Sequence, residues 1–173
     1  MTFTEDELNL LASVPQLIGT AMAAASGSGL FGTGKEAFAN ASSVLEGLKS
    51  YPDNALIREL LPDPAADRKA AVEKMSRTRD WASARLKANG VNSAETLTQQ
   101  VLADARAAAA LLDAKASPAE AENYRAWTMA IAEKVANAAT EGGFLGFGGE
   151  RLSAPEKALL AQIREALGGP QTA

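Results

Sequence analysis

The sequence contains neither cysteine nor histidine. The chain therefore has no disulfide bond, no metal or haem ligation through these side chains, and no Ser–His or Cys–His nucleophile pair. Aromatic residues make up only 5% of the 173 residues, and valine and isoleucine together number ten, whereas alanine numbers 38 and leucine 20. Because alanine and leucine favour helices and β-branched residues favour strands, the composition predicts a helical protein.

The chain has no excess of positive charge. Lysine and arginine number 17 against 21 aspartates and glutamates, which gives a net charge of −4. Domains dedicated to nucleic-acid binding normally carry a basic surface that pairs with phosphates. We therefore expect no nucleic-acid partner.

The uncharged stretch from Leu8 to Ala25 is interpreted as a buried helix. A secretory leader carries positive charge ahead of its apolar segment, whereas Glu5, Asp6 and Glu7 precede this one and the first basic residue is Lys35. The stretch also holds several polar residues and a proline, which disfavours a membrane span. We therefore expect a soluble protein without a membrane span, located in the cytoplasm.

Capping signals and apolar spacing predict an all-α bundle of about seven or eight helices. A capping box, in which Ser or Thr is followed three residues later by Glu, begins helices at Thr4, Ser117 and Ser153. Gly90 is expected to end a helix in the left-handed conformation, and Gly168-Gly169-Pro170 is expected to end the last helix. Further caps are expected at Asp53 or Asn54 and at Ser93. The helices should cover about residues 5–25, 35–49, 54–61, 64–89, 94–116, 118–140 and 154–167.

The first of these helices is apolar around more than half of its circumference, which predicts a place in the middle of the bundle. Pro15 lacks an amide and crowds the carbonyl four residues earlier, so we expect a bend there. The apolar residues of this helix are Leu10, Leu11, Val14, Leu17, Ile18, Ala21 and Met22. Two later helices carry the buried stripes Leu97, Val101, Ala105, Ala108, Leu112 and Tyr124, Trp127, Ile131, Val135, Ala138.

A basic helix is expected from the Asp63-Pro64 cap to Gly90. Its lysines and arginines are spread around the helix and interleaved with acidic residues, of which Glu73 pairs favourably with Arg77 four positions on. We interpret them as a solvated face, with an anionic partner as the alternative. The inner face of this helix is predicted to carry Val72, Met75, Ala82 and Leu86.

Two glycine-rich segments each follow a long helix and precede a shorter one, which predicts an internal duplication. The alternative is that glycine-rich linkers between helices converge on a similar composition. The segments are residues 26–34 and 141–149. A single domain over 1–169 would then consist of pseudo-symmetric halves at 1–62 and 94–169, a connecting helix at 63–90 and a frayed tail at 170–173.

The second of these segments lies within a recognisable pattern. Val135-Ala136-Asn137-Ala138-Ala139 leads into it, and Gly149-Glu150-Arg151-Leu152-Ser153-Ala154-Pro155-Glu156-Lys157-Ala158-Leu159-Leu160 follows. This order of alanine-rich helix, turn, Ser-x-x-Glu cap and leucine-rich helix, mainly over residues 130–167, resembles the repeat of tellurite-resistance TerB-like proteins. The resemblance implies a duplicated, all-helical, cytosolic bacterial domain associated with stress or metal-oxyanion resistance. The resemblance also implies carboxylate metal binding in some members. Gly148-Gly149 stands here where the family has its acidic residue before the turn glycine, with Glu141 upstream and an insertion between, so we expect no metal site.

The glycine-rich segments contain large apolar side chains, which must either fold back over the end of the bundle or meet a partner. As candidate binding residues we take Leu30, Phe31, Phe144, Leu145 and Phe147. We therefore expect a non-enzymatic interaction module that binds a protein partner or a second copy of itself, without a cofactor.

Two other classes of function compete with this expectation. One is a small-molecule binder with an apolar pocket between the two halves, lined by residues such as Met22, Trp127 and Ile131. The other is a carboxylate-dependent enzyme, which is disfavoured because no pair of acidic residues converges in the sequence pattern. Among the many acidic pairs, Glu120/Glu122, Glu133/Glu141 and Glu150/Glu156 show no metal-ligand motif.

Overall fold

The computed structural model describes residues 2–25, 34–63, 65, 67–140 and 152–169, which form seven helices and no strand. The helices are α1 (Glu5–Ala23), α2 (Gly34–Ser50), α3 (Ala55–Leu60), α4 (Arg68–Ala88), α5 (Ala94–Lys115), α6 (Pro118–Thr140) and α7 (Ala154–Ala166). The all-α prediction is confirmed for this part of the chain, and most helix ends lie within two residues of their expected positions.

Local hydrogen bonds explain where the helices begin. The amide of Thr4 donates to the Glu7 carboxylate (2.7 Å) while the Thr4 hydroxyl accepts from the Glu7 amide (3.3 Å). The same reciprocal pairs start α6, through Ser117 and Glu120, and α7, through Ser153 and Glu156. Each box satisfies backbone groups that a helix terminus leaves without partners. Three capping boxes predicted from sequence are therefore confirmed.

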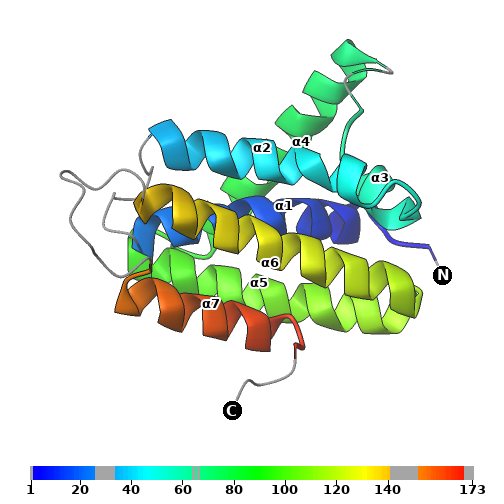
Figure 1. Cartoon of the computed structure of the whole chain (residues 1–173). Coiled ribbons are helices and arrows are strands. Elements are labelled where there is room, and N and C mark those ends of the chain that lie inside the picture. Colours follow the sequence, from blue (N-terminus) through cyan, green and yellow to red (C-terminus); the bar gives the residue numbers. More distant parts are fainter. Residues whose placement is uncertain (1, 26–33, 64, 66, 141–151, 170–173) are drawn as a thin grey trace.

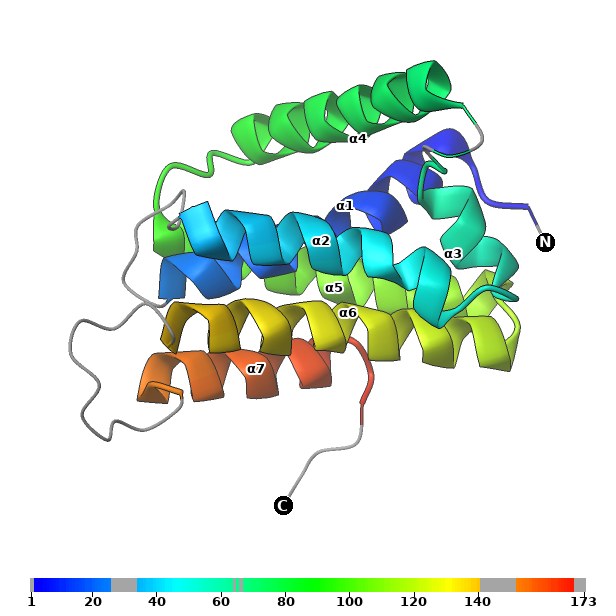
Figure 2. The same cartoon turned by 45° about the horizontal axis from the view of Figure 1, so that its top comes forward.

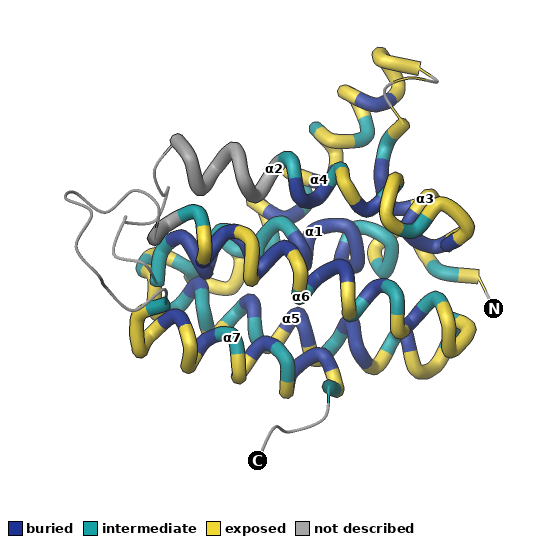
Figure 3. Tube along the Cα trace, viewed as in Figure 1, coloured by how far each residue is buried: buried dark blue, intermediate teal, exposed yellow. Residues whose placement is uncertain are grey.

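Helix α1 lies in the middle of the bundle and contacts every other described helix. Figure 1 shows it enclosed, and in Figure 3 most of its length is coloured as buried. Its apolar side chains, including Leu11, Val14, Ile18 and Met22, are removed from solvent. This confirms the central position predicted from its broad apolar surface.

Helices α2, α6 and α7 lie side by side in Figure 1, and α5 packs against α6 and α7. The predicted α5 stripe is buried throughout, and on α6 all of the predicted residues are buried except Ala138, which is half-buried. At Gly47, α2 approaches α6 so closely that an added Cβ would lie 2.7 Å from Nε1 of Trp127. The small side chains of these helices permit close packing.

Helix α4 begins later than expected. Asp67, rather than Asp63, is its N-cap and accepts from the Ala70 amide at 3.0 Å. Asp63 instead closes a local turn by accepting from the amide of Ala65 at 2.9 Å. Its end is as predicted, because Gly90 has a φ of 70°.

The predicted inner face of α4 is wrong at two of its four positions. Val72 is 58% exposed and Met75 is 50% exposed, whereas Ala82 is buried and Leu86 is half-buried. Helix α4 instead packs onto α1 through the small residues Ala71, Thr78 and Ala82 and the half-buried Lys74, Trp81 and Arg85. Figure 2 shows α4 lying across the outside of the bundle, and Figure 3 shows how much of it is exposed. Because each residue turns the helix by about 100°, Val72 and Met75 lie on the flank of the packed face.

Within the described residues, no helix combines the length and the apolar character needed to cross a membrane.

Candidate functional site

The five predicted binding residues in the glycine-rich segments, Leu30, Phe31, Phe144, Leu145 and Phe147, lie outside the described residues. An apolar pocket lined by Met22, Trp127 and Ile131 stays a prediction. Met22, Trp127 and Ile131 are buried in the hydrophobic core, and neither of the two hollows described below includes them. The features of the described residues that suggest binding gather instead at α4.

The C-terminal half of α4 is fastened to the bundle by polar contacts. Trp81 donates its indole N–H to the Asp6 carboxylate of α1 at 3.0 Å. Arg85 donates from Nη2 (2.7 Å) and Nε (3.1 Å) to Asp104 of α5, which is only 1% exposed. Gln100 donates to the same carboxylate at 2.9 Å. The buried acid is thus surrounded by donors, and α4 is held to both α1 and α5.

The guanidinium of Arg85 also lies over the ring of Trp81, 5.5 Å from its centroid. The hydrogen bond to Asp104 raises the pKa of Arg85 above its ordinary value, despite partial burial. The two residues and their partners form one connected anchor. Contacts with α1 and α5 therefore hold the C-terminal half of α4 in place, and the N-terminal half continues from it.

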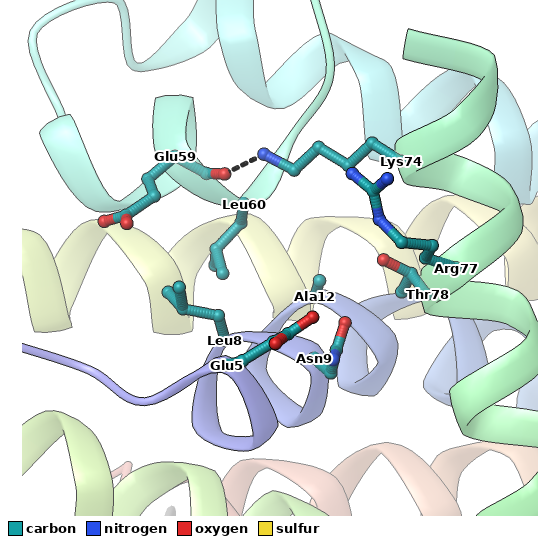
Figure 4. Close-up of a pocket in the computed structure, with 9 residues that line it drawn as sticks. All are labelled: Glu5, Leu8, Asn9, Ala12, Glu59, Leu60, Lys74, Arg77 and Thr78. Carbon is teal, nitrogen blue, oxygen red and sulfur yellow. Dashed lines mark hydrogen bonds between the residues drawn. The ribbon is translucent and has the colours of Figure 1, made fainter. Parts of the chain in front are cut away.

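The N-terminal half of α4 borders a cleft of about 230 Å³ between α1, α3 and α4 (Figure 4). The residues that line it are Glu5, Leu8, Asn9, Ala12, Glu59, Leu60, Lys74, Arg77 and Thr78. Leu8, Ala12 and Leu60 form an apolar floor. The polar residues are Lys74, Arg77 and Thr78 on a largely cationic wall from α4, Glu5 and Asn9 on a wall from α1, and Glu59 at the α3 end.

The cationic wall has one fixed and one available cation. Lys74 donates from Nζ to the backbone carbonyl of Glu59 in α3, which closes the upper end of the cleft. Partial burial lowers the pKa of Lys74, and the nearby Glu59 carboxylate opposes this effect. Arg77 is exposed and forms no ion pair with any described residue, so the pair with Glu73 that the spacing predicted does not form. Its guanidinium is thus free to meet a ligand.

Thr78 is the most deeply placed polar group of the cleft. It is only 4% exposed, and Figure 4 shows its hydroxyl directed toward the cleft. Among the described residues, this hydroxyl has no hydrogen-bond partner, and the same holds for the amide of Asn9. In the described residues the buried side-chain atoms without a partner are Trp127 Nε1 and Glu156 Oε1, so the Thr78 hydroxyl oxygen is still within reach of solvent or a ligand in the cleft.

The flank of α4 that faces away from the cleft is apolar and basic. Val72 and Met75 are the exposed large hydrophobic residues of the described part of the chain. Arg68 and Arg79 share their flank, and Arg79 pairs only with its exposed neighbour Asp80. Helix α4 holds seven basic and two acidic side chains, a net +5, while the rest of the chain holds ten basic and nineteen acidic, a net −9.

A second hollow, of about 560 Å³, lies where the turn between α2 and α3 meets the start of α6. Three of its polar residues, Asn54, Ser117 and Glu120, form structural hydrogen bonds. Asn54 caps α3 by accepting from Ile57 (2.9 Å) and donates to the Glu120 carbonyl (3.3 Å). The Glu120 carboxylate belongs to the capping box of α6. These three residues therefore serve the caps of α3 and α6.

Metal binding finds no support in the described residues, where no three acidic side chains gather as ligands. The Oε2 atom of Glu156 caps α7 through Ser153, and its buried Oε1 atom has no hydrogen-bond partner among the described residues. Comparison with family models, with characterised proteins and with solved structures found no match to this chain. The geometry around α4 therefore carries the functional argument.

The cleft is not predictable from the sequence, because its residues come from three helices that are separate in the chain. One signal was present in the sequence, namely the basic excess of residues 68–88, which was interpreted as a solvated face. The exposure of Arg68, Arg77 and Arg79 agrees with that interpretation, and an anionic partner remains the alternative.

Proposed function

We propose that the protein is a non-enzymatic interaction module whose α4 docks an acidic, amphipathic segment of a partner protein. The observation that carries the proposal is the coincidence of Val72 and Met75 with the only strongly basic helix of the described residues. An apolar patch flanked by arginines fits a partner that presents apolar side chains among carboxylates.

Each part of the flank has a physical role in such docking. Burial of Val72 and Met75 would supply most of the affinity, and the flexible Met75 side chain adapts to different partner shapes. Arg68 and Arg79 would select acidic partners and accelerate encounter. The ion pair between Arg85 and Asp104 would keep α4 attached to the bundle when the partner binds.

The resemblance to TerB-like proteins supports the same class of function and extends it. On that resemblance we propose a bacterial, cytosolic module with a duplicated architecture, associated with stress or metal-oxyanion resistance. The aromatic residues of the segments at 26–34 and 141–149 would then form a second contact surface, for a protein partner or for self-association.

A designed peptide tests the docking surface directly. The probe is a fluorescein-labelled, 20-residue amphipathic helix with leucine on one face and glutamate elsewhere, and the readout is fluorescence anisotropy. We expect saturable binding that weakens as salt screens the charges. The double variant Val72→Ser/Met75→Ser should lose at least tenfold in affinity, about 1.4 kcal/mol.

Two controls define the outcome. Lys134→Ala removes an exposed cation on α6, far from the proposed surface, and should leave the affinity unchanged. Vesicles containing phosphatidylglycerol test the same flank against an anionic membrane. Peptide binding that does not respond to the double variant, or vesicle binding without peptide binding, would contradict the proposal.

A further inference from the structure

We infer that the cleft between α1, α3 and α4 binds a small zwitterion of amino-acid size, with its carboxylate toward Arg77 and Thr78 and its ammonium group toward Glu5 and Asn9. The site is separate from the docking flank proposed above, because Val72 and Met75 do not line the cleft. Failure of one proposal therefore leaves the other testable.

The charges of the two walls select the ligand class. Arg77 stands on the α4 wall and Glu5 on the α1 wall, across the apolar floor (Figure 4). A phosphate or a dicarboxylate would be repelled by Glu5, and a metal ion or a diamine would be repelled by Arg77 and Lys74. A molecule with one charge of each sign satisfies both walls.

The uncharged polar side chains of the cleft would fix the orientation of the ligand. Thr78 is 4% exposed as a residue, and its hydroxyl, which has no partner among the described residues, is directed toward the cleft and is placed to donate to a carboxylate. The side-chain carbonyl of Asn9 is placed to accept from an ammonium group. A site that places buried hydrogen-bonding groups discriminates strongly against analogues that lack the matching atoms.

Size and polarity agree with this class. A volume of about 230 Å³ is below the range of drug-sized pockets, roughly 300–1,000 Å³. The floor of Leu8, Ala12 and Leu60 would contact an aliphatic side chain of the ligand. Lys74 is already bonded to the Glu59 carbonyl and serves to close the upper end.

The test uses the full chain and each standard amino acid as a separate probe, followed by saturation-transfer NMR and calorimetry. Acetate and methylammonium serve as half-ligands. We expect at least one amino acid to bind saturably, and each half-ligand to bind at least tenfold more weakly because it meets only one wall. Thr78→Val and Glu5→Gln should each weaken binding by about tenfold or more.

Matched variants keep the test decisive. Thr78→Ser retains the hydroxyl and should bind nearly as well as the unaltered protein, and Arg79→Ala, on the opposite flank of α4, should bind equally well. The inference is overturned if no amino acid binds at concentrations up to about 10 mM. It is equally overturned if acetate alone matches the amino acid, or if Thr78→Val folds and binds normally.

Discussion

The hydroxyl of Tyr124 in α6 donates a hydrogen bond of 2.8 Å to the backbone carbonyl of Leu11 in α1. This carbonyl would normally accept from the amide four residues later, but that residue is Pro15, which has no amide hydrogen. Tyr124 therefore replaces the hydrogen bond that the proline removes. Burial raises the pKa of Tyr124, so the hydroxyl keeps the proton that it donates.

We predict that Tyr124→Phe destabilises the protein by about 1–3 kcal/mol, because the buried Leu11 carbonyl loses its partner. In a Pro15→Ala background the restored amide again satisfies this carbonyl, so the same substitution should cost less. Urea unfolding of the four proteins measures the coupling. Tyr51→Phe, at a half-buried position before α3, is the control and should have little effect. An equal loss of stability from Tyr124→Phe in both backgrounds would show that the Tyr124 hydroxyl does not substitute for the missing amide of Pro15.

We predict that Gly47→Ala destabilises the protein, although the same substitution in an ordinary helix stabilises it by about 0.5–1 kcal/mol. An added Cβ would lie 2.7 Å from Nε1 and 2.8 Å from Cε2 of Trp127, which is too close for either helix to accommodate unchanged. Overpacking of this kind costs about 1–3 kcal/mol in urea unfolding. The cost should shrink in a Trp127→Leu background, where the ring is absent. A stabilising effect of Gly47→Ala alone would show that α2 and α6 are farther apart.

We predict that Arg85→Ala costs about 3 kcal/mol, because it leaves the buried Asp104 carboxylate without its countercharge. The amides of α4 should also exchange faster with solvent, since the helix loses one of its anchors. Adding Asp104→Ala should recover part of the stability. Arg79→Ala breaks a pair whose side chains are both about 70% exposed and should cost less than about 1 kcal/mol. Equal costs for the two arginines would contradict this assignment.

We predict that the capping box of α6 makes stability depend on pH. Hydrogen bonds from the Ser117 hydroxyl and amide lower the pKa of Glu120 below its ordinary value of 4.5. A group whose folded-state pKa is lowered stabilises the fold above the unfolded value and loses that effect as the pH falls through the folded value. The stability difference between the unaltered protein and Glu120→Gln should therefore be present at about pH 7 and fade at about pH 3.

The control for this prediction is Glu122→Gln, an exposed position on the same helix. Its urea midpoint should follow that of the unaltered protein at each pH. A difference for Glu120→Gln that stays constant across the pH range would show that the carboxylate charge is not what the box uses.

Helix starts were predictable because their chemistry is local. Thr4, Ser117 and Ser153 each bond to a residue only three positions away, so the pattern in the sequence contains both partners. The cap of α4 was misplaced for a related reason. Asp63 and Asp67 are both suitable N-cap residues, and each accepts a hydrogen bond from a nearby amide. The helix begins only after Asp67.

By itself the sequence determined the helical character of the chain, the caps of its helices and the central place of α1, because these depend on neighbours in the chain and on apolar surface. Only the tertiary structure decided which side of α4 meets the bundle. The small residues Ala71, Thr78 and Ala82 let α4 approach α1, and this leaves Val72 and Met75 on the exposed flank. The cleft depends on the same packing of α4, because α1, α3 and α4 must come together before Arg77 and Glu5 can line one cleft.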